Sequence, residues 1–256
     1  MKRKEMNEER FTGKALIYDE YRPSYPPEVV TRILKEISSD EPPIAADVGS
    51  GTGKFARLLL QRGCKVFCVE PNADMRAIAE KNLSGYDGFV SVAASAEHTS
   101  LPDRSVDLVT AAQSFHWFDR AAFASECERI LRKGGKAALI WNGYDTSSDK
   151  AIALKELCAA YCLGFKGFSG GARTDRSFDD FFSDYETNVF NGEIAYDLRS
   201  FTGRCMSSSY SPSSDTPAHA QFRNALERFF DSNAKDGILV MPLITVCHCG
   251  SVRSRL

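Results

Sequence analysis

The sequence predicts an α/β protein built on a doubly wound, mostly parallel sheet. The main indication is the stretch from Ile44 to Glu70: an apolar run, a glycine-rich turn, a helical segment and a second apolar run that ends on an acid. This order is typical of one half of a nucleotide-binding sheet. Strands and helices continue to alternate as far as Trp141. With 256 residues, 43% of them hydrophobic, the chain can bury a sizeable core.

The glycine-rich turn has the features of a ligand site. Gly49, Gly51 and Gly53 lack the side chains that would keep a ligand away from the backbone. The turn leads into a helix N-terminus, whose free N–H groups attract polar or anionic groups. Glu70, at the end of the next strand, can accept two hydrogen bonds from a ribose diol.

The segment Asp47–Gly53, DVGSGTG, closely resembles motif I of the class I S-adenosylmethionine-dependent methyltransferases. In that family the acid faces the amino-acid end of the cofactor, and the turn holds its carboxylate and sulfonium region. Glu70 matches the acid that binds the ribose, and Pro71 to Met75 resembles the D/E-P-x-x-x-M pattern that follows. The resemblance implies S-adenosylmethionine as the cofactor and S-adenosylhomocysteine as its product.

Two later segments also resemble this family. Ser95-Ala96-Glu97 is similar to the segment that lines the adenine, with Ser95 where relatives often carry aspartate. Gln113–Asp119, QSFHWFD, resembles the A-Q-x-F-H-W-F motif of the methyltransferase type 11 or trans-aconitate methyltransferase-like subgroup. The cofactor-binding residues implied are Asp47, Gly49, Ser50, Gly51, Thr52, Gly53, Glu70, Pro71, Met75, Ser95, Ala96, Glu97 and Gln113.

The resemblance also implies the fold in more detail: a Rossmann-like, seven-stranded sheet with an antiparallel last strand and helical cap segments. We expect strands at 44–47, 65–69, 89–93, 105–112, 137–141, 187–197 and 238–249. We expect helices at 26–37, 55–60, 71–81, 120–131, 149–163, 179–182 and 217–231. We expect one methyltransferase domain, residues 1–256, with these parts: an N-terminal cap (1–43), a cofactor-binding core (44–142), substrate-cap insertions (143–186 and 198–216), and C-terminal strands and helix (187–197 and 217–256).

Composition argues against several classes of partner. The formal net charge of -2 gives no basic surface for nucleic acid. No apolar run approaches the roughly 20 residues of a membrane span, and the N-terminus does not resemble a secretory signal. The eight cysteines are therefore expected to be free thiols in a reducing cytoplasm, with no metal at Cys247-His248-Cys249. Either a monomer or a homodimer is compatible with the sequence.

The acceptor residues are expected on the cap segments and just after the fourth strand. His116 stands at the mouth of the expected site, where it could act as a base, hold an anionic substrate or be structural. Arginine and tyrosine suit a small carboxylic acid, because guanidinium grips carboxylate through paired hydrogen bonds. The expected substrate-binding residues are Tyr18, Tyr21, Arg22, His116, Trp117, Arg204 and Tyr210.

Several alternatives stay open at this level. Trp117 could wall the pocket or pack against the next helix, and the N-terminal tyrosines could form a lid or pack as an entry segment. A methyltransferase of RNA, DNA or protein is a second function, although Gln113–His116 replaces the N-P-P-Y of base-methylating enzymes. A non-catalytic nucleotide-binding module or a dehydrogenase is a third, but the dehydrogenase would need the wider G-x-G-x-x-G spacing.

Overall fold

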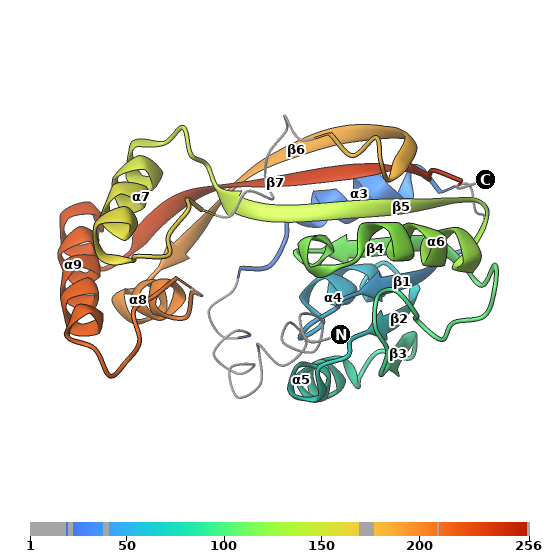
Figure 1. Cartoon of the computed structure of the whole chain (residues 1–256), viewed down its shortest axis with the longest axis horizontal. Helices are drawn as coiled ribbons and strands as arrows, with labels where there is room; N and C mark the ends of the chain where they lie inside the picture. Colours follow the sequence, from blue (N-terminus) through green and yellow to red (C-terminus); the bar gives the residue numbers. More distant parts are fainter. Residues whose placement is uncertain (1–18, 20–22, 38–40, 169–176, 209, 255–256) are drawn as a thin grey trace.

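A seven-stranded sheet forms the centre of the computed structural model, which describes residues 19, 23–37, 41–168, 177–208 and 210–254 (Figure 1). Its strand order is β3-β2-β1-β4-β5-β7-β6. Only β7 runs antiparallel to its neighbours, β5 and β6. The predicted doubly wound, Rossmann-like sheet with an antiparallel last strand is thereby confirmed. The strands are β1 (Ile44–Val48), β2 (Lys65–Val69), β3 (Phe89–Val92), β4 (Val106–Ala112), β5 (Leu131–Tyr144), β6 (Phe182–Tyr196) and β7 (Leu239–Val252).

Helices cover both faces of the sheet. One core cluster packs α3 and α4 against one face, and a second packs α6 and the aromatic turn at 178–181 against the other. Burial on both faces explains why the central strands are almost continuously apolar. The helices are α3 (Pro27–Leu34), α4 (Lys54–Leu60), α5 (Ala73–Leu83), the 3-10 turn η2 (Phe115–Trp117), α6 (Arg120–Ile130), α7 (Asp149–Tyr161), α8 (Leu198–Met206) and α9 (Pro217–Asn233).

The helix starts follow from local side chains. Pro27 opens α3, where its missing N–H costs nothing and its fixed φ suits the first turn. A side-chain oxygen accepts a backbone N–H at the start of four other helices, which satisfies a donor that the helix cannot. These capping residues are Asn72, Asp119, Ser148 and Asp197.

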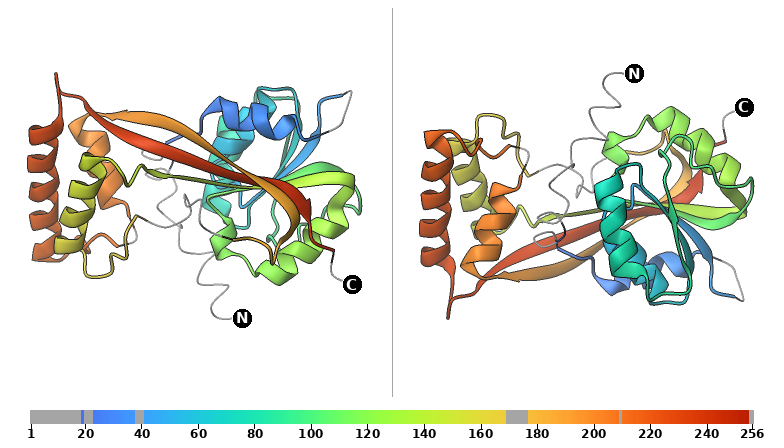
Figure 2. Two further views of the ribbon diagram at one scale, coloured as in Figure 1. Left: turned by 90° about the horizontal axis from the view of Figure 1, so that it is seen from above. Right: turned by 90° about the horizontal axis from the view of Figure 1, so that it is seen from below.

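The last two strands extend well beyond the rest of the sheet and carry a cap. β6 and β7 pair from Phe182–Val252 to Tyr196–Leu239, whereas β7 pairs with β5 only as far as Tyr144–Leu243. At the far end α7, α8 and α9 enclose a third core cluster of their own. α9 is outermost, and α7 and α8 lie on the side toward the sheet (Figures 1 and 2). Although the sequence grouped α9 with the C-terminal strands, it packs with the cap helices.

In the second half of the chain one predicted helix is wrong and another helix was missed. The expected helix at Asp179–Phe182 is a turn that leads directly into β6. Phe178, Phe181 and Phe182 have helical spacing, but all three are buried in the core cluster around α6. Helix α8 was not predicted at all, because Thr202 and Gly203 are weak helix formers in its middle.

β5 is also longer than the predicted strand at 137–141. Its first part contains a bulge, because Val106 pairs with Leu131 and Leu108 pairs with Lys136. Gly134, with φ of 83°, lies in this bulge, so the predicted glycine turn is an irregularity within the strand. The C-terminal extension to Tyr144 carries the chain into the cap.

No disulfide joins the cysteines of the described residues. All eight thiols belong to described residues, and each is free and buried. In the same part of the chain, no helix combines the length and the apolar character needed to cross a membrane.

A substitution at Gly250 tests how closely β6 and β7 approach each other. A Cβ at this position would lie 1.9 Å from the Asp184 carbonyl oxygen, whereas a Cβ at Gly192 would meet nothing within 4 Å. Gly250→Ala should lower the free energy of unfolding by about 2–3 kcal/mol through overpacking. Gly192→Ala, also in β6–β7, should change it by less than about 0.5 kcal/mol. Urea denaturation measures both; equal losses would contradict the close approach.

Candidate active site

The glycine-rich turn between β1 and α4 is held by the backbone of the neighbouring strand. Gly49, Gly51 and Gly53 all have positive φ, of 65°, 56° and 81°. The N–H groups of Gly49 and Ser50 donate to the Val69 carbonyl oxygen at 2.8 and 3.2 Å. The turn thus depends on glycine at three positions and is fixed to the end of β2.

The three glycines serve different purposes. A Cβ on Gly49 would lie 2.5 Å from the Ser114 Cβ, and one on Gly53 would lie 2.5 Å from the Leu83 Cδ1. These two positions need glycine for packing as well as for backbone conformation. A Cβ on Gly51 would meet none of the described residues within 4 Å. Gly51 therefore exposes backbone to open space, as expected where a ligand approaches.

The Glu70 carboxylate lies directly against this open position. Its Oε2 accepts the Gly51 N–H at 2.9 Å, and its Oε1 accepts the Asn72 N–H at 2.9 Å. The side chain is 9% exposed. The Arg76 guanidinium donates to the Glu70 carbonyl oxygen at 2.9 Å. One carboxylate thus joins the glycine turn to the start of α5.

The other two residues predicted after β2 differ in exposure. Asn72 caps α5 by accepting the Met75 N–H at 3.0 Å. Met75 is buried, and Pro71 is half-buried at the end of β2. Pro71 is therefore the more accessible of the two, while Met75 lies on the buried side of α5.

Asp47 is a buried acid in the middle of the sheet. Its Oδ1 accepts the Thr110 hydroxyl at 2.7 Å, and its Oδ2 makes no well-formed hydrogen bond within the described residues. Burial raises the pKa of Asp47 from 3.8 to about 7, against the opposing effect of the Thr110 hydroxyl. A buried carboxyl with a free oxygen is suited to a polar ligand group at the end of β1. Thr110 was not singled out in the sequence, because it contacts Asp47 from another strand.

The hydroxyl groups of the turn are buried as well. Ser50 Oγ makes no well-formed hydrogen bond among the described residues, although it is shielded from solvent. Thr52 is buried beside the Asp19 carboxylate. Asp19 accepts Asn82 Nδ2 at 3.1 Å and lies 3.5 Å from Lys54 Nζ. Asp19, which the sequence analysis did not consider, is thus held beside the glycine turn.

The loop after β3 contains the predicted adenine residues. Ser95 accepts the His98 N–H at 3.3 Å, which closes a tight turn around Ala96. Ala96 is buried, whereas Ser95 and Glu97 are half-buried. Glu97 Oε1 accepts the Asp119 N–H at 3.0 Å, so this loop is tied to the start of α6.

The chain turns sharply after β4. Gln113 has φ of 58°, its N–H donates to the Ile140 carbonyl at 2.8 Å, and its Nε2 donates to the Asn142 carbonyl at 2.6 Å. Ser114 Oγ donates to the Val48 carbonyl at 2.8 Å. Gln113 is thereby bound to β5, and η2 is held at the edge next to the glycine turn.

η2 buries one aromatic residue and exposes the next two. Phe115 packs among Phe123, Trp141 and other aromatic rings below the sheet edge. His116 is exposed, and Trp117 is 36% exposed with its ring centroid 4.6 Å from that of His116. His116 and Trp117 therefore present their rings at the surface.

The remaining predicted substrate residues divide into two groups. Tyr18, Tyr21 and Arg22 lie outside the described residues. Arg204 belongs to α8, and Tyr210 follows it in the cap. Both lie in a cluster with Tyr144 and Tyr196, two residues that only the fold brings together.

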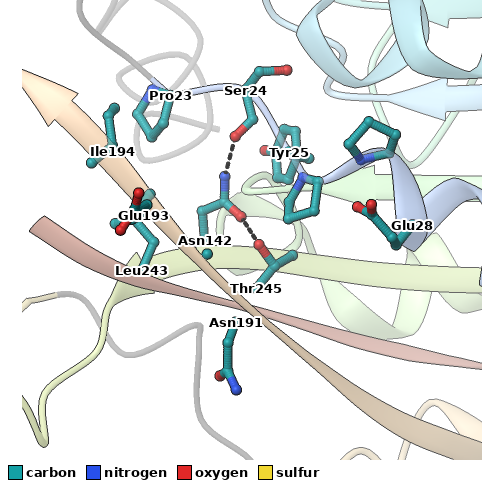
Figure 3. Close-up of a pocket in the computed structure, with 13 residues that line it drawn as sticks. Pro23, Ser24, Tyr25, Glu28, Asn142, Asn191, Glu193, Ile194, Leu243 and Thr245 are labelled. Atoms are coloured by element: carbon teal, nitrogen blue, oxygen red, sulfur yellow. Dashed lines mark hydrogen bonds between the residues drawn. The ribbon is translucent and has the colours of Figure 1, made fainter. Parts of the chain in front are cut away.

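A hollow of about 430 Å³ lies between the segment that precedes α3 and the strands that lead to the cap (Figure 3). Asn142 lies in this hollow: its Nδ2 donates to the Ser24 carbonyl at 2.9 Å, and its Oδ1 accepts the Thr245 hydroxyl. Because the Asn142 carbonyl also binds Gln113, this residue joins the entry segment to the edge of the candidate site. The sequence analysis did not single out Asn142, because its partners Ser24 and Thr245 are distant in the sequence.

Comparison with known sequences supports a methyltransferase core. Residues 46–139 match the methyltransferase domain family, a segment that includes the glycine turn, Glu70 and Gln113. An uncharacterized methyltransferase of Mycobacterium tuberculosis is 39% identical over 132 residues, 50% of each chain. Another from Schizosaccharomyces pombe is 34% identical over 145 residues, 55% of this chain and 57% of its own. The chain thus matches about half the length of these relatives.

A named enzyme and two solved structures extend the comparison. The malonyl-[acyl-carrier protein] O-methyltransferase of Methylococcus capsulatus is 34% identical over 131 residues, 49% of this chain and 48% of its own. A proposed type II methyltransferase from Anaeromyxobacter dehalogenans has a TM-score of 0.67 at 19% identity, over 90% of this chain and 98% of its own. A proposed methyltransferase from Anabaena variabilis has a TM-score of 0.56 at 18% identity, over 88% and 98%. The fold is therefore that of the Rossmann-like methyltransferases.

The raised pKa of Asp47 predicts how the free energy of unfolding depends on pH. Below about pH 4 the carboxyl is protonated in both states; between 3.8 and 7 only the native state keeps the proton. The free energy of unfolding should therefore fall as pH rises through this window and stay low above it. Asp47→Asn should remove this fall, making the variant more stable than the parent by about 2–4 kcal/mol at pH 8 but not at pH 4. Urea denaturation across pH tests this; parallel profiles would contradict it.

Proposed function

We propose that this protein transfers a methyl group from S-adenosylmethionine to a small-molecule acceptor. The proposal is supported by the family match over residues 46–139 and by relatives that are described as methyltransferases. The observation that carries it is the space that the described residues leave open at Gly51, with the Glu70 carboxylate at the Gly51 N–H. An adenosyl cofactor needs both a side-chain-free approach and an acid for its ribose.

The residues around the glycine turn fit such a cofactor. The buried carboxyl of Asp47 and the Ser50 hydroxyl each have an oxygen without a well-formed hydrogen bond in the described chain. Glu70, Pro71, Ala96 and the loop around it would hold the adenosine portion. When bound, the cofactor supplies an electrophilic methyl group on a sulfonium.

The protein's own part in this reaction is alignment and exclusion of water. Methyl transfer is an in-line displacement, so holding the acceptor in the correct position supplies much of the rate. A carboxylate acceptor needs no base, whereas a hydroxyl or ammonium does. His116 and Trp117, whose rings are exposed beside the turn after β4, would contact the acceptor.

We propose a carboxylic acid as the acceptor. The acidic net charge of the chain does not favour a polyanionic macromolecule. One relative is an O-methyltransferase of malonyl-[acyl-carrier protein], a substrate with a carboxyl group. A carboxylate can react without loss of a proton, so its methylation needs no side chain at the edge of the sheet to act as a general base.

Gly51→Ala tests the position of the cofactor. The added methyl group would occupy the open space, so the affinity for S-adenosylhomocysteine should fall at least about tenfold. Gly134→Ala is the matched control, because Gly134 also has positive φ and open space around it but lies in the bulge of β5. It should keep the parent's affinity. Calorimetric titration with S-adenosylhomocysteine, and with NAD for comparison, measures this. Binding of NAD alone would contradict the proposal.

Glu70→Ala should lower the affinity for S-adenosylhomocysteine for two reasons. It removes the acceptor expected for the ribose hydroxyls, and it releases the N–H groups of Gly51 and Asn72. We expect a loss of about 2–3 kcal/mol in binding, typical of a hydrogen-bonded carboxylate. Glu80→Ala, on the exposed side of α5, is the control and should bind normally. An unchanged dissociation constant for Glu70→Ala would place the cofactor elsewhere.

A further inference from the structure

The cap contains an arginine that has no acidic partner. Arg204 is half-buried, and its Nε is shielded from solvent without a hydrogen bond among the described residues. No ion pair joins Arg204 to a carboxylate in that part of the chain. The groups that act on its charge are instead the phenols of Tyr144, Tyr196 and Tyr210 and the thiol of Cys205.

The three phenols do not supply a negative charge at neutral pH. Burial raises the pKa of Tyr210 to about 12, and it raises the pKa values of Tyr144 and Tyr196 in the same way. The hydroxyl oxygens of Tyr144 and Tyr196 lie 3.4 Å apart, so both are directed to one point. Removing a guanidinium from water without a counter-ion is costly, and an anionic ligand would offset this cost.

The cluster lies beyond the same edge of the sheet that carries the cofactor turn. Tyr144 is the last residue of β5, and Tyr196 is the last residue of β6. Both strands are parallel to β1, whose C-terminal end leads into the glycine turn. In this fold ligands bind at the C-terminal ends of the strands. α8, which carries Arg204, is on the side of the cap toward the sheet (Figures 1 and 2).

We propose that Arg204, together with the hydroxyls of Tyr144, Tyr196 and Tyr210, binds a carboxylate group of the methyl acceptor. This inference rests on the proposed function, and it assigns the acceptor class to particular residues. The planar guanidinium matches a carboxylate through paired hydrogen bonds, and phenol hydroxyls can donate to the same oxygens. The cap would then hold the acceptor by this group, so that its other end faces the core.

The test is calorimetric titration of a set of small mono-, di- and tricarboxylic acids into the protein saturated with S-adenosylhomocysteine. At least one acid should bind, and Arg204→Met should weaken it about 100-fold, as expected when a buried charge loses its partner. Inorganic phosphate is a separate arm and should not bind. Equal affinity in parent and variant, binding of phosphate alone, or binding of no acid would overturn the proposal.

Two controls separate a binding role from a structural one. Arg199→Met makes the same change at an exposed position of α8 and should leave acid binding unchanged. Without ligand, Arg204→Met should melt at the same or a higher temperature than the parent, because no ion pair is lost. A fall in melting temperature together with unchanged acid binding would show a structural role.

A third variant and the cofactor titration complete the design. If Arg204→Met does not fold, Tyr196→Phe serves in its place. It removes a single hydroxyl from the same cluster and should lower the affinity for the acid about tenfold. Undiminished binding by that variant would count against the site. S-adenosylhomocysteine should bind the parent and Arg204→Met alike. Failure of the parent to bind it would contradict the proposed function, whereas a loss confined to acid binding concerns the cap alone.

Discussion

The candidate site depends on the two hydrogen bonds of the Glu70 carboxylate. Through them the end of β2 holds the Gly51 N–H on one side and the Asn72 N–H on the other. Gly51 has a backbone conformation that few residues adopt, and none of the described residues fills the space where its Cβ would lie. A loop of this kind would otherwise sample many conformations. Because a single buried acid holds both segments, the space beside Gly51 keeps its shape.

A second constraint is the length of β6 and β7. Their pairing continues beyond the point where β5 ends, so the same two strands serve the sheet and the cap. The cap helices have a separate apolar cluster, which includes Leu154, Phe201 and Phe222. This arrangement lets the cap differ in its polar residues without disturbing the cofactor turn, which belongs to the other two clusters.

The sequence was sufficient for features that depend on neighbours in the chain. The glycine turn, the acid after β2 and the alternation of strands and helices up to β5 have local patterns, and the structure has them at these places. Features set by distant contacts were missed or wrong. Helix α8 contains weak helix formers but is stabilised by burying Phe201 in the cap. The spacing at 178–182 imitates a helix, yet pairing of Phe182 with Val252 makes it a strand.

The features that the sequence predicted lie mostly within the family match, and those that it missed lie mostly in the cap. The family match ends at residue 139, just before β5 leaves the sheet, and the relatives share only about half of the chain. Arg204 lies well beyond that limit, in a helix without a local pattern, and its phenol neighbours come from β5, β6 and the turn after α8. Arg204 is half-buried, and a cation that pairs with no acid among the described residues adds little to the stability of a fold. Its place in the cap fits the proposal that Arg204 binds the acceptor, in the part of the chain outside the family match.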